Sequence, residues 1–444
     1  MSAARFDLLV RDGIAVTPAG IAAADIGITG GRIAGIGNLA RAEATETIDA
    51  RGLHVLPGLI DTQVHFREPG SEHKEDLATG TRGAVLGGIT AVFEMPNTKP
   101  STLTAADLDD KFARAAGRAW CDHAFFIGAA AENAAKLGTL ERRPGCCGVK
   151  VFMGSSTGGL LVEDDQTLAQ VFAHGTRRVA IHAEDEPRLR QRKALAEAEK
   201  HPRAHPVWRD EETALAATRR LLALARKAGR RVHVLHITTE EEMALLAEHR
   251  DIATVEVTPQ HLTLSAPECY ERLGTLAQMN PPIRAERHRA GLWRALASGV
   301  VDVIGSDHAP HTRAEKAKPY PASPSGMPGV QTTLPLMLDH VNAGRLTLER
   351  LVDLLAHGPQ RIYQIAAKGR LMLGYDGDLT IVDLKAKRTI EEKWIASKSG
   401  WSPFTGMNVT GWPVATVIRG QVVMREDEVL GAPVGKPVRF AECL

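Results

Sequence analysis

Cysteine is scarce in this chain, with only five among 444 residues. They are scattered, at Cys121, Cys146, Cys147, Cys269 and Cys443. An odd number of cysteines without Cys-x-x-Cys spacing argues against a disulfide framework and against a zinc site made of thiolates. We therefore expect a protein of a reducing compartment, the cytoplasm.

The chain also lacks an excess of charge and a long apolar run. Its 54 lysines and arginines nearly balance 53 aspartates and glutamates, which gives no support to a nucleic-acid partner. No apolar stretch approaches the roughly 20 residues of a membrane-spanning helix, and residues 1–7 do not begin a secretory signal. These absences predict a soluble globular protein without a nucleic-acid or membrane partner.

What the sequence does contain is an alternation of apolar, strand-like runs with helical stretches. Eight such runs recur, at residues 54–66, 89–97, 122–130, 148–153, 178–184, 231–237, 252–259 and 301–306. Segments 215–227 and 240–249 between them carry apolar residues at helical spacing. Eight strand–helix units predict an α/β fold, a (β/α)8 barrel of the TIM type. A doubly wound open sheet is the alternative, although no strand leads into a Gly-x-Gly-x-x-Gly turn.

Both ends of the chain are rich in strand-like residues instead. Such runs lie at residues 7–13, 26–33, 379–383 and 415–423. A chain of 444 residues exceeds the usual size of one domain, so a smaller companion to the barrel is expected. We predict a small β-sandwich domain built from residues 1–57 and 368–444, and a barrel domain over residues 58–367.

The first predicted barrel strand carries an unusual set of polar side chains. Because side chains alternate faces along a strand, four of them are predicted to share one face. These four are Asp61, Gln63, His65 and Arg67. An acid, an amide, an imidazole and a guanidinium do not build a core, and they suit a site that holds a metal and an anionic substrate.

Candidate metal ligands recur at the predicted carboxyl ends of other strands, where barrels of this kind place their functional residues. Five of them, from five strands, are His65, Lys150, His182, His236 and Asp307. Imidazole and carboxylate ligands suit Zn2+ best, with manganese, cobalt or iron as alternatives. A bound divalent ion makes hydroxide available at neutral pH, and Asp307 is expected to bind the metal and carry the proton.

Lys150 lies in an apolar strand, so burial is expected to lower its pKa. A neutral amine can take up CO2 and become N6-carboxylated, and the two carbamate oxygens can bridge two metal ions. The alternative is an inward lysine paired with an aspartate or a glutamate. Both interpretations stay open at this point.

The remaining polar residues divide between substrate and structure. Arg67, Asn97 and His311 suit a substrate carboxylate. His233, three residues before His236, is expected to face the opposite side of its strand and to be structural, and Glu184 is expected to have no role in the site. The Pro/Ser/Gly-rich segment 311–329 is either a lid over the substrate or a mobile surface loop.

Several of these motifs, in order, resemble dihydroorotases of the cyclic amidohydrolase family. The matching segments are residues 58–70, 94–100, 150–157, 279–284 and 306–311. The resemblance covers nearly the whole chain and implies a metal-bearing barrel with a β-sandwich from both termini. It also implies reversible hydrolysis of a small molecule, dihydroorotate, to N-carbamoyl-aspartate in pyrimidine synthesis.

The resemblance also implies roles for individual residues. The metal set is His65 and Lys150, which matches the carboxylated bridging lysine of many members, together with His182, His236 and Asp307, which is also the general base. The substrate set is Arg67, Asn97 and His311 around the carboxylate, with Asn280 in the matching substrate-contact turn. Hydantoinases and allantoinases share the metal set, and the pair Arg67 and Asn97 favours dihydroorotate. We also expect a homo-oligomer.

One departure from the family pattern is serious. Gln63 stands where the family has the first histidine of its Asp-x-His-x-His strand, and an amide is a weaker zinc ligand than imidazole. Three outcomes are open: a one-metal enzyme, a two-metal enzyme with a loosened first site, or an inactive homologue that serves as a scaffold. Because the rest of the set is present, we expect an active enzyme with one or two ions.

Overall fold

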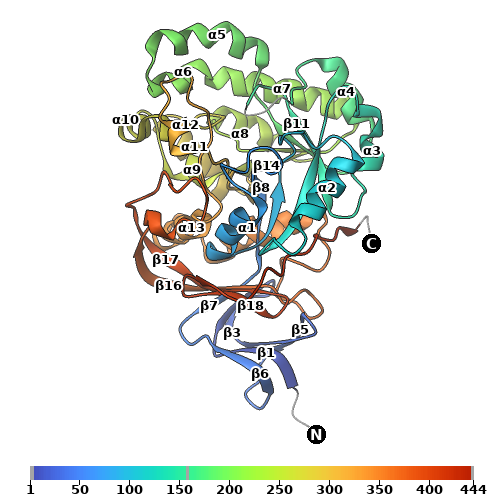
Figure 1. Cartoon of the computed structure of the whole chain (residues 1–444), viewed down its shortest axis with the longest axis vertical. Helices are drawn as coiled ribbons and strands as arrows, with labels where there is room; N and C mark the ends of the chain where they lie inside the picture. The colour runs from blue at the N-terminus through green and yellow to red at the C-terminus, as the bar shows by residue number, and fades with distance from the viewer. Residues whose placement is uncertain (1–4, 157–159, 442–444) are drawn as a thin grey trace.

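The structure, a computed structural model, describes residues 5–156 and 160–441. Figure 1 shows a ring of strands surrounded by helices, with two β-sheets below it toward the N-terminus. The two parts are built on different strand patterns, and each is described in turn.

The ring is a barrel of eight parallel strands, each paired with the next along the chain. The strands are β8 (Leu59–Val64), β9 (Ile89–Glu94), β10 (Asp122–Gly128), β11 (Cys146–Phe152), β12 (Val179–His182), β13 (Val232–Val234), β14 (Ala253–Val257) and β15 (Val303–Ile304). The ring closes beyond β15, where Val64 bridges His308 and the His65 amide donates to the His308 carbonyl at 2.7 Å. The predicted (β/α)8 barrel is confirmed.

Helices follow the strands along the chain, and Figure 1 shows many of them around the outside of the barrel. They are α1 (Leu77–Leu86), α2 (Ala105–Ala115), α3 (Leu137–Leu140), α4 (Asp165–Ala173), α5 (Glu186–Glu199), α6 (His205–Trp208), α7 (Glu211–Ala228), α8 (Glu240–Ala247), α9 (Pro259–Thr263), α10 (Glu268–Leu273), α11 (Glu286–Ala297), α12 (Arg313–Lys316), α13 (Thr333–Asn342), α14 (Leu348–Val352) and α15 (Gly358–Tyr363). Local sequence fixes many of their ends. Asp76 caps α1 by accepting from the Thr79 amide, and Gly229, at φ 65°, ends α7 in the left-handed conformation that glycine adopts without strain.

Alternation along the strands divides the barrel residues between two cores. Phe93, Phe126 and Ala180 pack together with Tyr363 of α15 inside the ring. Their neighbours in sequence point outward and join the larger core beneath the helices. Apolar side chains therefore fill the interior of the barrel below the carboxyl ends of the strands, where the residues predicted for the site lie.

The lower part consists of two sheets. One has the strand order β5 (Arg32–Gly37), β4 (Asp25–Thr29), β1 (Arg5–Arg11), β6 (Glu43–Asp49). The other has the order β19 (Glu428–Val429), β18 (Gln421–Arg425), β17 (Asn408–Ile418), β16 (Leu379–Thr389), β7 (His54–Pro57), β2 (Ile14–Thr17), β3 (Gly20–Ala23). Both contribute to one apolar core.

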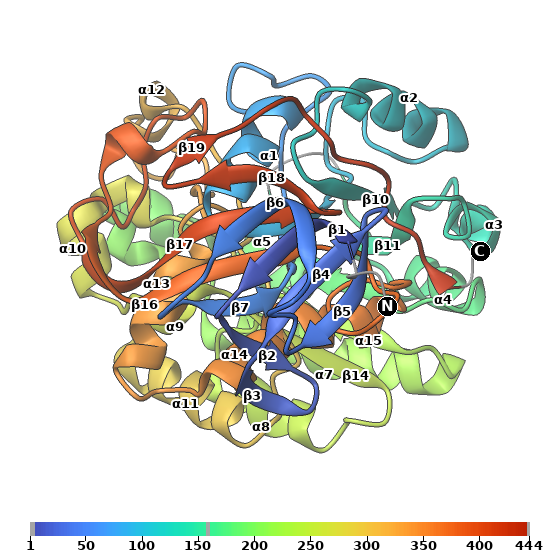
Figure 2. The same ribbon diagram turned by 90° about the horizontal axis from the view of Figure 1, so that it is seen from below.

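Strands from the two ends of the chain lie side by side in this part, as Figure 2 shows from below. The link is β7, which pairs antiparallel with β16 so that Pro57 lies opposite Leu379. The expected contribution of both termini to a β-sandwich is confirmed. The domain boundaries at 57/58 and 367/368 stay a prediction.

The single strand expected over residues 54–66 is in fact two strands, β7 in the lower sheet and β8 in the barrel. Gly58 separates them where the backbone passes close to its neighbours: a Cβ there would lie 2.5 Å from both Asp378 Cβ and Thr90 Oγ1. Even one methyl group would collide at this crossing between the two parts.

The alternation predicted from Asp61 to Arg67 also fails. The pairing of β8 with β9 shifts register between Asp61 and Val64, the strand ends at Val64, and Arg67 has φ 64°. Asp61 accepts hydrogen bonds from the amides of Gln63 and Ser306 and so supports the strand ends. Gln63, His65 and Arg67 reach the carboxyl end of the barrel by a bulge and a turn.

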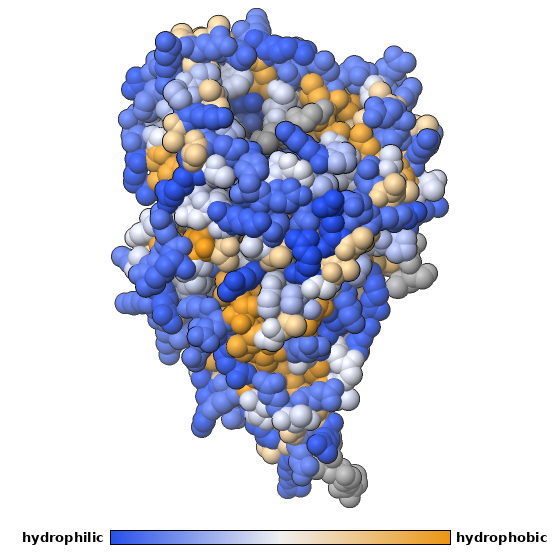
Figure 3. Space-filling view, in the orientation of Figure 1, coloured by the Kyte–Doolittle hydropathy of each residue, from blue (hydrophilic) through white to orange (hydrophobic). Residues whose placement is uncertain are grey.

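The surface view in Figure 3 is mostly hydrophilic over the barrel, and apolar surface gathers over the sheets below. Within the described residues, helix length and hydropathy do not meet the requirements for crossing a membrane.

Candidate functional site

A pocket of about 330 Å3 opens at the carboxyl ends of the barrel strands. It is lined by eight of the ten residues predicted for the site: Gln63, His65, Arg67, Asn97, His182, His236, Asn280 and Asp307. Lys150 lies behind the lining residue Phe152, with its Nζ 4.4 Å from the ring centre. His311 lies behind Arg67, with 3.3 Å between His311 Nε2 and Arg67 Nη2. The fold thus brings the ten residues together from six strand ends and two loops.

Asp307 joins the first strand of the barrel to the last. Its Oδ1 accepts from Gln63 Nε2 at 3.1 Å and lies 3.1 Å from His65 Nε2. The other ring nitrogen of His65 is 2.8 Å from Asn97 Oδ1. Burial lowers the pKa of His65, and the carboxylate of Asp307 opposes this shift. A neutral imidazole is the form that binds metals.

His182 and His236 form the second half of the polar cluster. His182 Nδ1 lies 3.0 Å from His236 Nε2, and both rings are buried. Burial lowers the pKa of both imidazoles, and each is further depressed by the charge of Lys150. Two neutral rings that turn one nitrogen each toward the same point are suited to a shared cation.

Several buried polar atoms around this point have no hydrogen-bond partner within residues 5–156 and 160–441. They include Lys150 Nζ, His236 Nδ1 and Gln63 Oε1. Burial without a partner is costly for such atoms, unless a ligand satisfies them. Burial also lowers the pKa of Lys150 to about 7, although Asp307 and Glu256 act to raise it. The donor set therefore fits one or two divalent ions, and burial brings the pKa of Lys150 close to neutral pH, where a substantial share of the amine is uncharged.

The alternative interpretation of Lys150 is an ion pair with a buried carboxylate, and Glu256 is a candidate for that partner. Burial raises the pKa of Glu256 to about 8, and its Oε2 accepts from Thr62 Oγ1 at 3.0 Å. Among the described residues Lys150 Nζ has no hydrogen-bond or ion-pair partner, while Glu256 accepts from Thr62 through Oε2 and its Oε1 has no partner. The geometry favours the uncharged lysine over the paired one.

Three residues of the site have a strained backbone conformation. Arg67, His236 and Asp307 have φ values of 64°, 39° and 43°, in the left-handed region that residues other than glycine rarely adopt. Strain of this kind costs about 1–3 kcal/mol per residue and is held where the surrounding structure fixes a functional geometry.

Glu184, which was expected to have no role in the site, contacts one of the predicted metal ligands. Its Oε2 lies 2.8 Å from His182 Nε2, and Arg209 Nε donates to both of its carboxylate oxygens, at 3.0 and 3.2 Å. Burial alone would raise the pKa of Glu184, but the Arg209 guanidinium and His182 outweigh it and hold that pKa well below its usual range. Glu184 therefore orients His182 so that Nδ1 faces the pocket. The spacing His182-Ala183-Glu184 at a strand end was the signal available in the sequence.

The expectation that His233 faces the opposite side of its strand from His236 does not hold. The strand β13 ends at Val234, and His236 lies beyond it, so strict alternation does not separate the two histidines. The His233 ring packs against Tyr363 inside the barrel, at 5.8 Å between ring centres. Its Nδ1 lies within hydrogen-bond distance of Thr254 Oγ1, at 2.9 Å. His233 is inside the barrel and below the pocket, and its role is structural as predicted.

The other end of the pocket is rich in hydrogen-bond donors. Arg67 is buried and its Nε donates to the Pro310 carbonyl at 3.2 Å. His311 donates from Nε2 to the Ser325 carbonyl at 3.0 Å, and its Nδ1 accepts from Lys74 Nζ at 3.2 Å. Lys74 was not predicted, because it lies in a loop that no periodicity marks. Burial, followed by the charge of Arg67, keeps the pKa of His311 far below its usual range.

The segment 311–329 forms part of the pocket wall. Ser325 and Gly326 line the pocket, and the segment is held by buried Lys316, whose Nζ donates to the carbonyls of Gln278, Pro324 and Gly326 at 2.8–3.2 Å. Its function as a lid stays a prediction.

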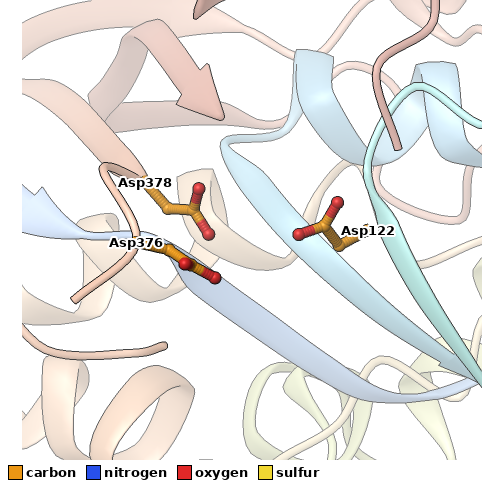
Figure 4. A group of neighbouring side chains, drawn as sticks. All are labelled: Asp122, Asp376 and Asp378. Atoms are coloured by element: carbon orange, nitrogen blue, oxygen red, sulfur yellow. The ribbon is translucent and has the colours of Figure 1, made fainter. Parts of the chain in front are cut away.

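A second group of carboxylates, drawn in Figure 4, lies at the opposite end of the barrel. Asp122, Asp376 and Asp378 place one oxygen each within 4.8 Å of the others. The Lys368 ammonium lies among them, 2.8 Å from Asp122 and 3.5 Å from Asp376, and contacts Asp378. Arg419 adds a second cation 2.5 Å from Asp122. The position of a metal is thus filled by side-chain cations, and this group ties the barrel to the sheets.

Comparison with known proteins agrees with this geometry. The profile of the amidohydrolase family matches residues 54–423. A dihydroorotase of Halobacterium salinarum is 37% identical over 414 residues, which cover 91% of this chain and 94% of that protein. An allantoinase of Deinococcus radiodurans is 34% identical over 448 residues, 98% of each chain. The solved structure of L-hydantoinase from Arthrobacter aurescens has a TM-score of 0.93 and 31% identity, and covers 98% of this chain and 100% of its own. The chain therefore belongs to the amidohydrolase family, with dihydroorotases among its relatives.

Proposed function

We propose that the protein is a dihydroorotase, which hydrolyses the cyclic amide of (S)-dihydroorotate to N-carbamoyl-L-aspartate and catalyses the reverse ring closure. The observation that carries the proposal is the pairing, in one pocket, of an imidazole–lysine–carboxylate cluster with a guanidinium that suits a carboxylate. Curated dihydroorotases that match about nine-tenths of the chain support the same reaction.

The substrate end follows from charge. Dihydroorotate carries a carboxylate on its ring, and Arg67 offers a buried guanidinium to it, with burial lowering its pKa only to about 10. Asn97 turns its side-chain oxygen to His65. Asn280 turns its side-chain oxygen to His205, so that its amide nitrogen is the group offered to the substrate. His311 supports this end from behind Arg67. Charge-assisted bonds of this kind fix the orientation of a small acid.

The cluster of side chains around Asp307 is the part of the pocket where we expect the amide bond to be hydrolysed. We infer that Lys150, His182, His236, His65 and Asp307 hold one or two Zn2+ ions, with Lys150 N6-carboxylated and Gln63 a weak ligand at most. A divalent ion held by these residues would polarise the amide carbonyl and lower the pKa of water. Asp307 accepts the proton of the attacking water and returns it to the ring nitrogen as the C–N bond breaks. Glu184 keeps His182 in the required tautomer.

We further propose a pathway, a cellular location and an oligomeric state for the protein. The reaction serves pyrimidine biosynthesis, the protein acts in the cytoplasm, and the working form is a homo-oligomer. Each is independent of the pocket geometry.

A second candidate is a related cyclic amidase, because the allantoinase and L-hydantoinase relatives align over 98% of this chain. The buried Arg67 argues against it, since a guanidinium without an anionic partner in the substrate is costly. A catalytically silent scaffold, suggested by Gln63, is disfavoured by Lys150 Nζ and His236 Nδ1, which are buried without a hydrogen-bond partner among the described residues, since a scaffold has no use for such atoms.

A substrate panel tests the proposal. Metal-replete protein is incubated with dihydroorotate, hydantoin, allantoin and dihydrouracil, and ring opening is followed by chromatography. We expect kcat/KM to be highest for dihydroorotate by a factor of about 100 or more, the value of one charge-assisted contact. Preferred turnover of a ring without a carboxylate would replace the proposal with the second candidate, and metal-replete protein inert to all four would favour the scaffold.

A further inference from the structure

A buried histidine that the sequence did not single out stands behind Asn280. His205 begins α6, in the connection between α5 and α7, and is fully buried. Its Nε2 lies 2.9 Å from Asn280 Oδ1 and 3.1 Å from the Met279 carbonyl oxygen. On its other side, Nδ1 lies 3.4 Å from the Tyr320 hydroxyl.

The protonation of His205 can be assigned from these partners. Burial, and next the charge of Arg209, lower the pKa of His205 to about 3, so the ring is neutral and carries one N–H. The Met279 carbonyl can only accept, so the hydrogen must be on Nε2. Nδ1 is then an acceptor, and the Tyr320 hydroxyl is placed to donate to it.

The same assignment fixes Asn280. The nitrogen and the oxygen of an asparagine side-chain amide have nearly the same shape, so the orientation of the amide is assigned from its hydrogen-bond partners. Because His205 presents an N–H, Asn280 must turn its oxygen toward the histidine and its NH2 group the other way. Asn280 lines the pocket, so its NH2 is the group available to a ligand there.

A flipped Asn280 would instead present an oxygen to the ligand. Next to a carboxylate, an oxygen is repulsive where an N–H bond is favourable, so the orientation selects acids. His205 is well held in turn: Trp208 and Tyr320 pack edge-on against it, each with ring centres 5.8 Å away. The orientation is therefore set by a rigid, buried group that does not itself line the pocket.

We propose that His205 is a positioning residue that locks the Asn280 amide with its NH2 toward the pocket, and that this lock selects substrates with a carboxylate. The substrate part of this inference rests on the proposed function, and the orientation part does not. His205 is separate from the metal cluster, so a loss of the lock is expected to change substrate binding more than chemistry.

The test is a double-mutant cycle between His205→Phe, which keeps an aromatic ring without a donor, and Asn280→Ala. We expect His205→Phe to raise KM for dihydroorotate by roughly 10- to 100-fold, the value of one hydrogen bond to a charged group, with kcat changed less than threefold. The same substitution should have no further effect in the Asn280→Ala background. His205→Gln, which restores a donor, should recover most of the loss, and His174→Phe, away from the pocket, should have none.

Additive effects of the two substitutions, or an equal rise of KM for dihydrouracil, which has no carboxylate, would overturn the inference. A wild-type protein without dihydroorotate turnover would refute the proposed function instead. The orientation is then read directly: a crystal structure of His205→Phe at a resolution that separates amide nitrogen from oxygen should show Asn280 flipped or in two conformations. An unchanged Asn280 would contradict the lock, whatever the activity.

Discussion

Replacing Glu184 by glutamine tests whether the carboxylate beside His182 organises the site. Glu184→Gln keeps the volume and removes the charge. The carboxylate is completely buried, and it joins His182 to an arginine, Arg209, that is only 2% exposed. The substitution leaves the guanidinium without its counter-charge and frees the imidazole to turn.

The expected magnitude follows from burial. Removing one partner of a buried ion pair costs about 3–5 kcal/mol, because the remaining charge stays buried. Unfolding entropy of about 2.1 cal/mol/K per residue gives about 0.9 kcal/mol/K for a chain of this length, so Tm should fall by about 3–5 °C. Loss of the carboxylate behind a metal-binding histidine should weaken zinc affinity by about 10- to 100-fold.

Calorimetry measures Tm, and competition with a chromophoric chelator measures zinc affinity. The pKa of Glu184 is held low in the folded state, so its contribution is present above the unfolded pKa of about 4.3 and is lost as pH falls below it. The difference in unfolding free energy between wild type and variant should therefore shrink in acid. Asp251→Asn, which breaks an exposed pair with Arg226, is the control and should leave Tm within about 1 °C. Wild-type Tm and zinc affinity in Glu184→Gln would refute the reasoning.

Three further predictions concern other parts of the chain. Gln63→His should raise the amount of metal bound per chain, measured by elemental analysis, and an unchanged amount would show that the surroundings limit occupancy. Arg67→Ala should raise KM for dihydroorotate by about 30-fold or more, because a buried charge pair is truncated, while hydantoin turnover should be spared; equal losses for both would argue against a carboxylate contact. Lys368→Met should lower Tm at neutral pH, because it leaves Asp378 without its ammonium partner and Asp122 with Arg419 alone, and the loss should shrink as acid protonates the aspartates. The pKa of Lys368 is raised despite its burial, because its aspartates hold the charge, so its contribution in wild type should last up to about pH 10 and fall above it; a Tm deficit independent of pH would contradict this.

The barrel could be predicted because alternation of strands and helices is a repeated signal. Eight apolar runs separated by helical segments leave few alternatives, and a misplaced boundary in one unit does not change the count. The contribution of both termini to one β-rich part could also be predicted, since residues 7–13 and 415–423 share the same strand-like pattern. The first strand was predicted incorrectly in detail, because nothing in its sequence marks the register shift after Asp61 or the left-handed turn at Arg67.

The metal-binding residue types could be predicted because they stand at strand ends, whose common direction in a parallel barrel brings them together. Their supporting residues could not. Glu184 pairs with Arg209, which is 25 positions further along the chain, Lys74 contacts His311 from a loop, and His205 contacts Asn280 from the connection between α5 and α7. Hydrogen bonds between side chains of distant loops leave no periodic trace in a sequence, so three-dimensional structure is needed to find them.

We propose that this pocket, with Gln63 in place of a histidine, is a working metal site for dihydroorotate. The most direct measurement is the turnover of dihydroorotate as zinc is titrated into metal-free protein, with bound zinc determined in the same samples. Formation of N-carbamoyl-aspartate should rise in proportion to bound zinc and saturate at one or two ions per chain. Protein that is saturated with zinc and still leaves dihydroorotate unchanged would contradict it.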